Sequence, residues 1–163
     1  MPVIREAAEQ DAAVLSELIR ASFRDVAERL GLTAENCPGH PSNCREQTVL
    51  KALAEGTRFF LLLWEGKPRA CVSCSPGRHG VFTLRRLAVL PEARLRGFGK
   101  LLVRHAMDDA WQHGADCVEV GVVAGEQWLI DFYKRLGFAV TRENVSMDEL
   151  PFEVTFLAHE FDD

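Results

Sequence analysis

The stretch LRRLAVLPEARLRGFGK, residues 84–100, decides the fold of this 163-residue chain. Its apolar run Leu87-Ala88-Val89 is typical of the end of a buried strand, and Pro91 follows, which cannot donate to a strand ladder. A basic turn with two glycines comes next. Beyond the turn, apolar side chains recur at helical spacing, at Leu102, Val103, Ala106, Met107 and Ala110. This order predicts a strand, a basic turn and a long helix that ends at Gly114.

The basic turn has the chemistry of an anion site. The first N–H groups of a helix have no acceptor within the helix, and the helix dipole adds partial positive charge there. Arg94, Arg96 and Lys100 add formal charge, and Gly97 and Gly99 let an anion approach the backbone. The sequence is neither a P-loop nor a complete Gly-x-Gly-x-x-Gly motif. It therefore predicts a phosphate or pyrophosphate site, with a packing turn of solvated charges as the alternative.

Two motifs of the sequence resemble the signatures of one protein family. The pattern Arg-x-x-Gly-x-Gly at 94–99, after a strand ending in Leu-Ala-Val, is similar to the acetyl-CoA signature of the GNAT superfamily of N-acetyltransferases. The stretch WLIDFYKRLGF at 128–138 resembles the second signature of that superfamily, a helix that carries Phe-Tyr and closes in Leu-Gly-Phe. The two motifs come in the family's order. The resemblance implies a single domain over residues 1–163.

The resemblance implies the GNAT fold, of the α/β (α+β) class. This fold has a central mixed, largely antiparallel twisted sheet of about six to seven strands, helices on both faces and a splayed pair of parallel strands. The residue patterns predict strands at 3–6, 58–64, 69–75, 81–89, 115–123 and 152–157. They predict helices through 14–23, 44–55 and 128–136. Asn43 and Glu46 resemble a capping box at the start of the second of these helices.

The resemblance also implies acetyl-CoA as co-substrate. The backbone of Leu87, Ala88 and Val89 would pair with the pantetheine arm, and the basic turn would hold the pyrophosphate. The turn residues are Arg94, Leu95, Arg96, Gly97, Phe98, Gly99 and Lys100. The family often carries Asn and Ala ahead of its tyrosine, where this chain has Glu126 and Leu129. We therefore expect Glu126 beside the cofactor, where an ionised carboxylate cannot donate a hydrogen bond.

In the family, an acceptor amine attacks the acetyl thioester directly, so the leaving thiolate needs a proton. Tyr133 matches the family's tyrosine near the sulfur and is the expected general acid; alternatively it is a packed tyrosine with its hydroxyl bonded to backbone. Glu119 is the candidate base on the neighbouring strand. Alternatively, Glu119 is a solvated side chain without a catalytic role. A chain of water molecules would then accept the proton of the amine. We expect His105 to face solvent.

Composition limits the partners. The hydrophobic content of 47% and charged content of 26% are ordinary for a globular protein, and the net charge of −5 disfavours nucleic acid and mildly favours an amine substrate. We expect no secretory leader, because the first residues turn polar at once, and the sequence shows no apolar run of membrane-spanning length. Its five cysteines are an odd number, which favours reduced thiols. We expect a cytoplasmic protein without a membrane partner, and the resemblance allows a homodimer.

Segment 31–43 is the least typical part of the chain, with two prolines and two glycines. Cys37, His40 and Cys44 have the spacing Cys-x-x-His-x-x-x-Cys, which supplies three zinc ligands, but burial is the commoner outcome and we expect no metal. The loop either shapes the acceptor pocket, with His40 or Glu35 near the amine, or is only fixed by its prolines. A non-catalytic acyl-CoA-binding module and a zinc-stabilised interaction domain remain alternative functions.

Overall fold

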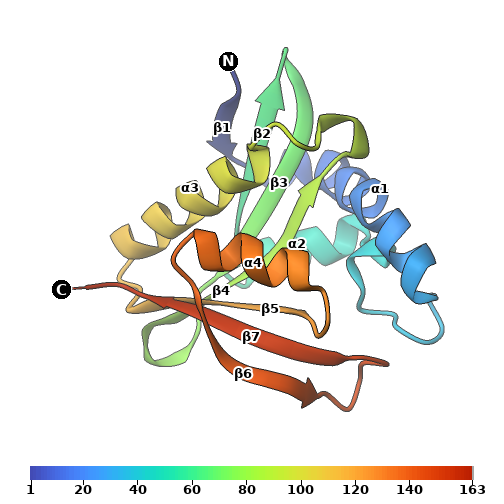
Figure 1. The fold of residues 1–163 in the computed structure, drawn as a ribbon. Coiled ribbons are helices and arrows are strands. Elements are labelled where there is room, and N and C mark those ends of the chain that lie inside the picture. The colour runs from blue at the N-terminus through green and yellow to red at the C-terminus, as the bar shows by residue number, and fades with distance from the viewer. Residues whose placement is uncertain (163) are drawn as a thin grey trace.

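The computed structural model describes residues 1–162, which form a seven-stranded sheet with helices on both faces (Figure 1). The strands are β1 (Val3–Glu6), β2 (Arg58–Trp64), β3 (Lys67–Ser75), β4 (Val81–Val89), β5 (Cys117–Val123), β6 (Ala139–Ser146) and β7 (Glu153–Glu160). The α-helices are α1 (Ala12–Leu30), α2 (Glu46–Ala54), α3 (Phe98–Gln112) and α4 (Gln127–Arg135). The strand order is β1-β2-β3-β4-β5-β7-β6, and within residues 1–162 only β4 and β5 pair in parallel. The predicted fold class is confirmed.

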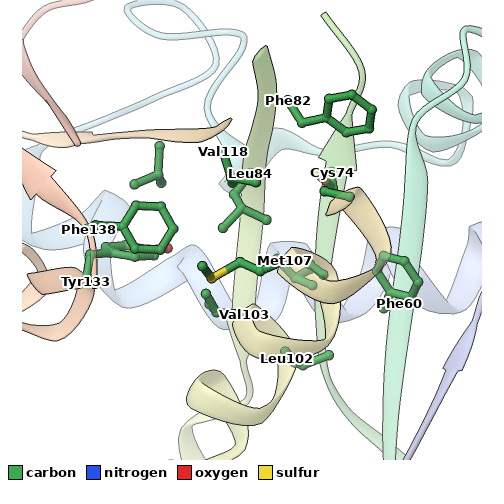
Figure 2. Close-up of a cluster of buried hydrophobic side chains, with 14 of the residues drawn as sticks. Phe60, Cys74, Phe82, Leu84, Leu102, Val103, Met107, Val118, Tyr133 and Phe138 are labelled. Atoms are coloured by element: carbon green, nitrogen blue, oxygen red, sulfur yellow. The ribbon is translucent and has the colours of Figure 1, made fainter. Parts of the chain in front are cut away.

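The sheet separates two hydrophobic cores. On one face, α3 and α4 cover a cluster that includes Leu84 and Leu102 (Figure 2). On the other face, α1 and α2 cover a second cluster that includes Phe59. Cys71 and Cys74 are three residues apart on β3 and lie in different cores, because successive side chains of a strand point to opposite faces. These two cysteines therefore do not form a chelating pair, as predicted.

Glycines end the two longest helices; the sequence predicts the end at Gly114 but not the extension of α1 to Leu30 and its end at Gly31. Gly31 takes φ 67° after α1, and its N–H donates to the carbonyls of Ala27 and Glu28. Gly114 follows the last turn of α3 with φ 89°. Both conformations lie in the left-handed region, which glycine adopts without a Cβ penalty. None of the helices in residues 1–162 combines the length and apolar character that crossing a membrane requires.

The predicted start of α2 is wrong. The helix begins at Glu46 instead of Cys44, and Arg45 is its extended N-cap residue. Asn43 belongs to a short 3₁₀ turn, and its side-chain amide donates to the Cys37 carbonyl at 3.1 Å. A local side-chain bond of this kind competes with helix capping. The helix therefore starts two residues late.

Other elements also depart from the prediction. Strand β6 was not expected, since it is largely exposed and carries charged residues. Strand β7 continues to Glu160, where pairing with β5 extends it beyond the alternating apolar run. His105 is only partly exposed instead of facing solvent, and its ring lies edge-on to Phe60 with a centroid distance of 4.8 Å.

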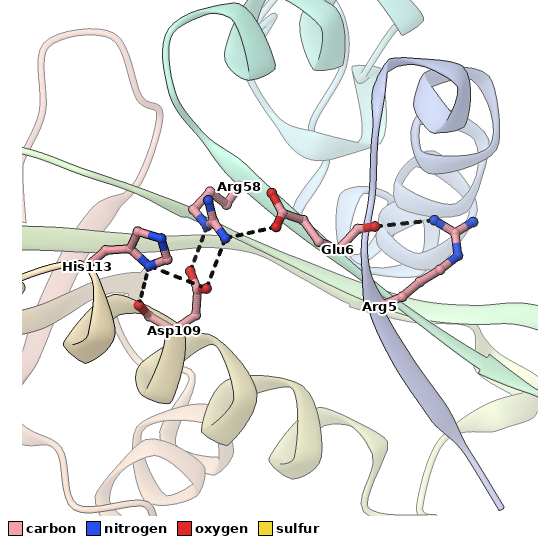
Figure 3. A network of polar contacts seen from close by, with 5 residues as sticks. All are labelled: Arg5, Glu6, Arg58, Asp109 and His113. Carbon is pink, nitrogen blue, oxygen red and sulfur yellow. Dashed lines mark hydrogen bonds and ion pairs between the residues drawn. The ribbon is translucent and has the colours of Figure 1, made fainter.

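A polar network joins β1, β2 and the C-terminal end of α3 (Figure 3). Arg58 Nε donates to Asp109 Oδ2 at 2.8 Å, and Arg58 Nη2 donates to Glu6 Oε1 at 2.8 Å. His113 Nδ1 lies 2.8 Å from the Asp109 carbonyl oxygen. The network fixes the C-terminal end of α3 against the sheet, while the basic turn lies at the opposite end of the helix.

Candidate functional site

Strands β4 and β5 pair over only part of their length. The parallel ladder begins at Val81 and ends with the pair Leu84–Val120. Strand β4 continues to Val89 paired with β3, and β5 continues paired with β7. Beyond the last pair, the facing edges of the two strands have no ladder between them in the described residues. An extended group that carries amides can pair with such an edge as an added strand does. This is the predicted splayed pair.

A β-bulge in β4 lies where the ladder ends. The register between β3 and β4 shifts between Cys71 and Ser73, so that Arg86 and Leu87 together oppose one residue of β3. Arg86 has φ 54°, which is uncommon for a residue with a side chain. Bulges bend a strand and increase its twist. The bulge therefore accounts for the separation of the end of β4 from β5.

The turn after β4 presents unpaired backbone N–H groups. Leu95 and Gly97 both have positive φ, 65° and 80°. Within residues 1–162, no backbone N–H from Leu95 to Lys100 donates to a protein acceptor; the first such bond joins Leu101 N to Gly97 O at 3.1 Å. A Cβ at Gly97 would meet no atom within 4 Å, so the surface here is open. Consecutive free N–H groups at the positive end of a helix dipole form an anion site.

Arg94 ties this turn to α1. Its Nε donates to Val89 O at 3.1 Å, its Nη2 donates to Ser22 O at 2.7 Å, and its Nη1 pairs with Asp25 Oδ2 at 2.7 Å. The hydrogen bonds from Arg94 hold the pKa of the Asp25 carboxyl below its ordinary value. With its guanidinium occupied in this way, Arg94 fixes the position of the turn. The carbonyl of Val89 is also taken by this contact.

The other cations of the turn are placed differently. The Arg96 guanidinium lies over the Trp64 ring at 4.3 Å from its centroid, a cation–π contact. Lys100 lines a small pocket of about 90 Å³ with Phe132, Leu136 and a second cation, Arg135. The pocket joins the start of α3 to α4. Lys100 and Arg135 therefore add positive charge beside the free N–H groups.

Tyr133 is a residue of α4, and its side chain packs into the core between α4 and the sheet. It is 3% exposed, and its ring makes edge contacts with Phe132 and Phe138 at centroid distances of 5.1 and 5.3 Å. Its hydroxyl points from α4 towards α3 and β4 (Figure 2). Burial raises the pKa of the phenol above its ordinary value. The phenol therefore stays protonated and remains a donor.

The two candidate carboxylates have different surroundings. Glu119 alternates with Val118 and Val120, so it faces away from the α3/α4 core; its side chain is 27% exposed and lies 3.7 Å from Arg142. Glu126 precedes α4 and forms an ion pair with Arg29 of α1 at 2.6 Å. Glu126 is the carboxylate that we predicted to lie beside the cofactor. Arg29 offsets its negative charge.

Segment 31–43 satisfies its own polar groups and packs on α1. The His40 Nδ1 lies 2.8 Å from Ser42 Oγ, and burial lowers the pKa of the imidazole. Cys37 and Cys44 are buried free thiols, and no group of three or more potential ligands in residues 1–162 could hold a metal ion. Glu35 is exposed on the outside of the loop. The loop therefore has a structural explanation that requires neither zinc nor a histidine base.

Arg86 is the residue near this opening that the sequence analysis did not single out. It lies in the bulge of β4, half-buried, on the side of Phe59 and Ser73. The signal was present as two adjacent arginines, Arg85 and Arg86, inside a strand whose other residues are apolar except for Thr83. Charged residues are rarely buried without a reason.

Comparison with known proteins agrees with this geometry. Residues 16–138 match the sequence model of the acetyltransferase (GNAT) family. The chain therefore belongs to the GNAT family of acetyltransferases, and the prediction of the family is confirmed. It is also 34% identical over 86 residues to an uncharacterized N-acetyltransferase, MJ1207, of Methanocaldococcus jannaschii. That match spans 49% of this chain and 38% of the relative.

Solved structures share the fold at low sequence identity. The PaiA N-acetyltransferase of Thermoplasma acidophilum, in complex with coenzyme A, has a TM-score of 0.81 at 16% identity, covering 99% of both chains. The structure of yncA of Salmonella typhimurium with acetyl-CoA has a TM-score of 0.75 at 18% identity, covering 100% of this chain and 95% of that one. The ribosomal-protein-alanine N-acetyltransferase of Brucella melitensis has a TM-score of 0.74 at 20% identity, covering 98% and 99%.

Proposed function

We propose that this protein is an N-acetyltransferase that transfers the acetyl group of acetyl-CoA directly to a primary amine of a small molecule or peptide. The observation that carries the proposal is the early end of the β4–β5 ladder, followed at once by the free N–H groups from Leu95 to Lys100. The first feature suits the amide-bearing pantetheine arm, and the second suits a pyrophosphate. Two structures of this fold contain coenzyme A or acetyl-CoA, which supports the same donor here.

The residues present fit such a donor. The edge of β4 at Leu87, Ala88 and Val89 would pair with the pantetheine arm, since β5 has separated from it. The turn from Leu95 to Lys100 would hold the pyrophosphate through Gly97, Phe98 and Gly99 N–H groups, with Arg96 and Lys100 as cations. Arg94 keeps this turn against α1, and Glu126, paired with Arg29, orders the start of α4 beside it.

When bound, acetyl-CoA supplies an activated acetyl thioester. The amine nitrogen forms a bond to the thioester carbonyl carbon, the carbon–sulfur bond breaks, and the thiolate leaves with the electron pair. Tyr133 donates its phenolic proton to that sulfur; its raised pKa keeps the proton in place until it is needed. Glu119, at the last part of the ladder and facing away from the α3/α4 core, takes the amine proton directly or through water.

The proposal includes a cytoplasmic enzyme whose partners are acetyl-CoA and an amine, without nucleic acid or membrane, and it allows a homodimer. The alternative is a module of the same fold that binds acyl-CoA without catalysis. Tyr133 favours the enzyme, because its hydroxyl points from α4 towards β4 (Figure 2) and burial raises the pKa of the phenol, so that it keeps the proton that it would donate.

The test is turnover of a panel of primary amines with acetyl-CoA, measured as release of the free thiol of coenzyme A, together with acetyl-CoA binding. The enzyme proposal predicts thiol release that depends on the amine and forms an equal amount of acetylated product. Binding of acetyl-CoA without thiol release on any amine of the panel would support the sensing module. An absence of binding would contradict both.

A further inference from the structure

Arg86 is a half-buried cation without an anionic partner. No carboxylate in residues 1–162 forms an ion pair with it. Its Nη1 donates to Ser73 Oγ at 3.1 Å, and the guanidinium lies 5.5 Å from the Phe59 ring centroid. A guanidinium has five N–H donors in a planar fork, so most of its donors remain unused. Removal of a charge from water costs free energy unless a partner of opposite charge compensates it. The half-buried Arg86 guanidinium would therefore gain from a partner of negative charge.

The backbone holds this side chain in an unusual conformation. Arg86 has φ 54° at the bulge, a left-handed conformation that is strained for a residue with a Cβ. The bulge directs the guanidinium towards Ser73 and Phe59, on the face of the sheet that α1 and α2 cover. The backbone of Arg86 lies two residues beyond the last pair of the β4–β5 ladder, at the start of the gap in which the acetyl group would be held.

A second cation converges on the same region. Arg20 of α1 donates from Nη1 to the Cys44 carbonyl at 2.7 Å, and it too has no ion pair in the described residues. Arg86 and Arg20 both exert their charge on the Cys44 thiol, although burial still raises the pKa of that thiol. The local charge is therefore positive in a protein whose net charge is −5. An amine alone would be repelled here, whereas an amine that also carries a carboxylate would be attracted.

We propose that the acceptor is a primary amine with a carboxylate, of the free amino acid type, and that Arg86 binds the carboxylate. This inference rests on the proposed acetyl transfer. Arginine suits the role because its fork matches the two oxygens of a carboxylate and forms short, charge-assisted hydrogen bonds. Arg20 adds to the attraction from α1. The occupied bond to Ser73 keeps the guanidinium oriented, since Ser73 Oγ itself donates to the Arg85 carbonyl at 3.0 Å.

The test compares each free amino acid with its carboxamide, which keeps the amine and side chain but removes the negative charge. Wild type should use at least one free amino acid with kcat/KM about tenfold or more above that of its amide. Arg86→Met should abolish this preference mainly through KM, and Arg86→Lys should restore part of it. Arg85→Met is the matched control, because Arg85 is the exposed neighbour and carries the same charge; its preference should stay within about twofold of wild type.

Ligand-induced thermal stabilisation separates this inference from the proposed acetyl transfer. Free amino acids should raise the Tm of wild type in the presence of coenzyme A and should not raise that of Arg86→Met, whether or not any amine is acetylated. Without ligand, Arg86→Met should keep or raise the Tm, since it removes an unpaired half-buried charge. Equal use and equal stabilisation by the amides, or an unchanged preference in Arg86→Met, would overturn the inference. A lowered Tm with unchanged preference would identify Arg86 as a structural partner of Phe59 instead.

Discussion

The proposed site for acetyl-CoA and the proposed site for the acceptor depend on two different kinds of chemical group. At the end of β4 and the start of α3, the features suited to acetyl-CoA are backbone groups: the open edge of β4 and the free N–H groups of the turn. On the α1/α2 side, the features suited to the acceptor are side chains: Arg86 from the bulge and Arg20 from α1. A backbone site recognises groups that every acyl-CoA shares. A side-chain site selects among acceptors.

The two surfaces also differ in how their charges are compensated. Arg94 and Glu126, which the sequence assigns to the cofactor, each have a partner of opposite charge on α1. Arg86 has none in the described residues. Charges that hold a scaffold are satisfied within the protein, whereas a charge that awaits a ligand is satisfied by that ligand. The predictions below test this division between structural and ligand-binding groups.

The largest expected effect on catalysis comes from Tyr133→Phe. This change removes the only phenolic proton in the chain and keeps the packing against Phe132 and Phe138. We expect kcat to fall about 100-fold, with the Kd for acetyl-CoA within about twofold of wild type. Steady-state kinetics and calorimetry measure the two quantities. An unchanged kcat would remove Tyr133 from the chemistry and leave it as a core residue.

Glu119→Gln should reduce kcat/KM about tenfold, because the amide keeps the size of the side chain and cannot accept the amine proton as a base. The control is Glu143→Gln, which removes an exposed carboxylate from β6. We expect the control to lie within about twofold of wild type. Equal activities for the two variants and wild type would assign the proton to a water chain.

Lys100→Met should weaken acetyl-CoA binding about fivefold at low salt, because it removes one cation beside the free N–H groups. The loss should shrink as ionic strength rises, since exposed charges are screened. Lys51→Met is the matched control; Lys51 is an exposed lysine on α2, which covers the other face of the sheet. Calorimetry at two salt concentrations measures the difference. The same loss in both variants would point to net charge instead of a local contact.

The smallest expected effect concerns Asp25, whose pair with Arg94 holds the turn against α1. Asp25→Asn should lower the free energy of unfolding by less than about 1 kcal/mol at neutral pH, because the Asp25 side chain is 54% exposed. The folded-state pKa of Asp25 is lowered from 3.8, so its contribution is full above that value and disappears as the pH falls through the folded pKa. Urea unfolding of both proteins at pH 7 and near pH 3 measures this. A difference that grows in acid would contradict the pairing.

Local patterns in the sequence predict the strand and the helix start that carry the proposed backbone site. Gly97 at the start of α3 and the apolar run ending at Val89 each follow from short-range rules, and both are observed. The two motif stretches also lead to the correct family. Strand β6 was not predicted, because its exposed and charged residues have no alternating apolar pattern. The strand depends on pairing with β7.

The side-chain site could not be predicted in the same way. The bulge at Arg86 comes from the register between β3 and β4, which no local pattern of β4 reveals. Arg20 reaches the same region from α1 only after the sheet has formed. Arg94 and Glu126 have partners on α1 that are remote in sequence. Tertiary pairing therefore decides which of the predicted charges are structural and which remain for a ligand.

The most direct test of the central claim is the binding of acetyl-CoA to wild type, Gly97→Glu and Gly114→Glu by calorimetry. Both glycines have positive φ and open space at the Cβ position, and they lie at opposite ends of α3, so the backbone strain is matched. The account predicts similar Kd values for wild type and Gly114→Glu, and at least about 100-fold weaker binding for Gly97→Glu through repulsion of the phosphates. Equal binding by all three folded proteins, or no binding by wild type, would contradict it.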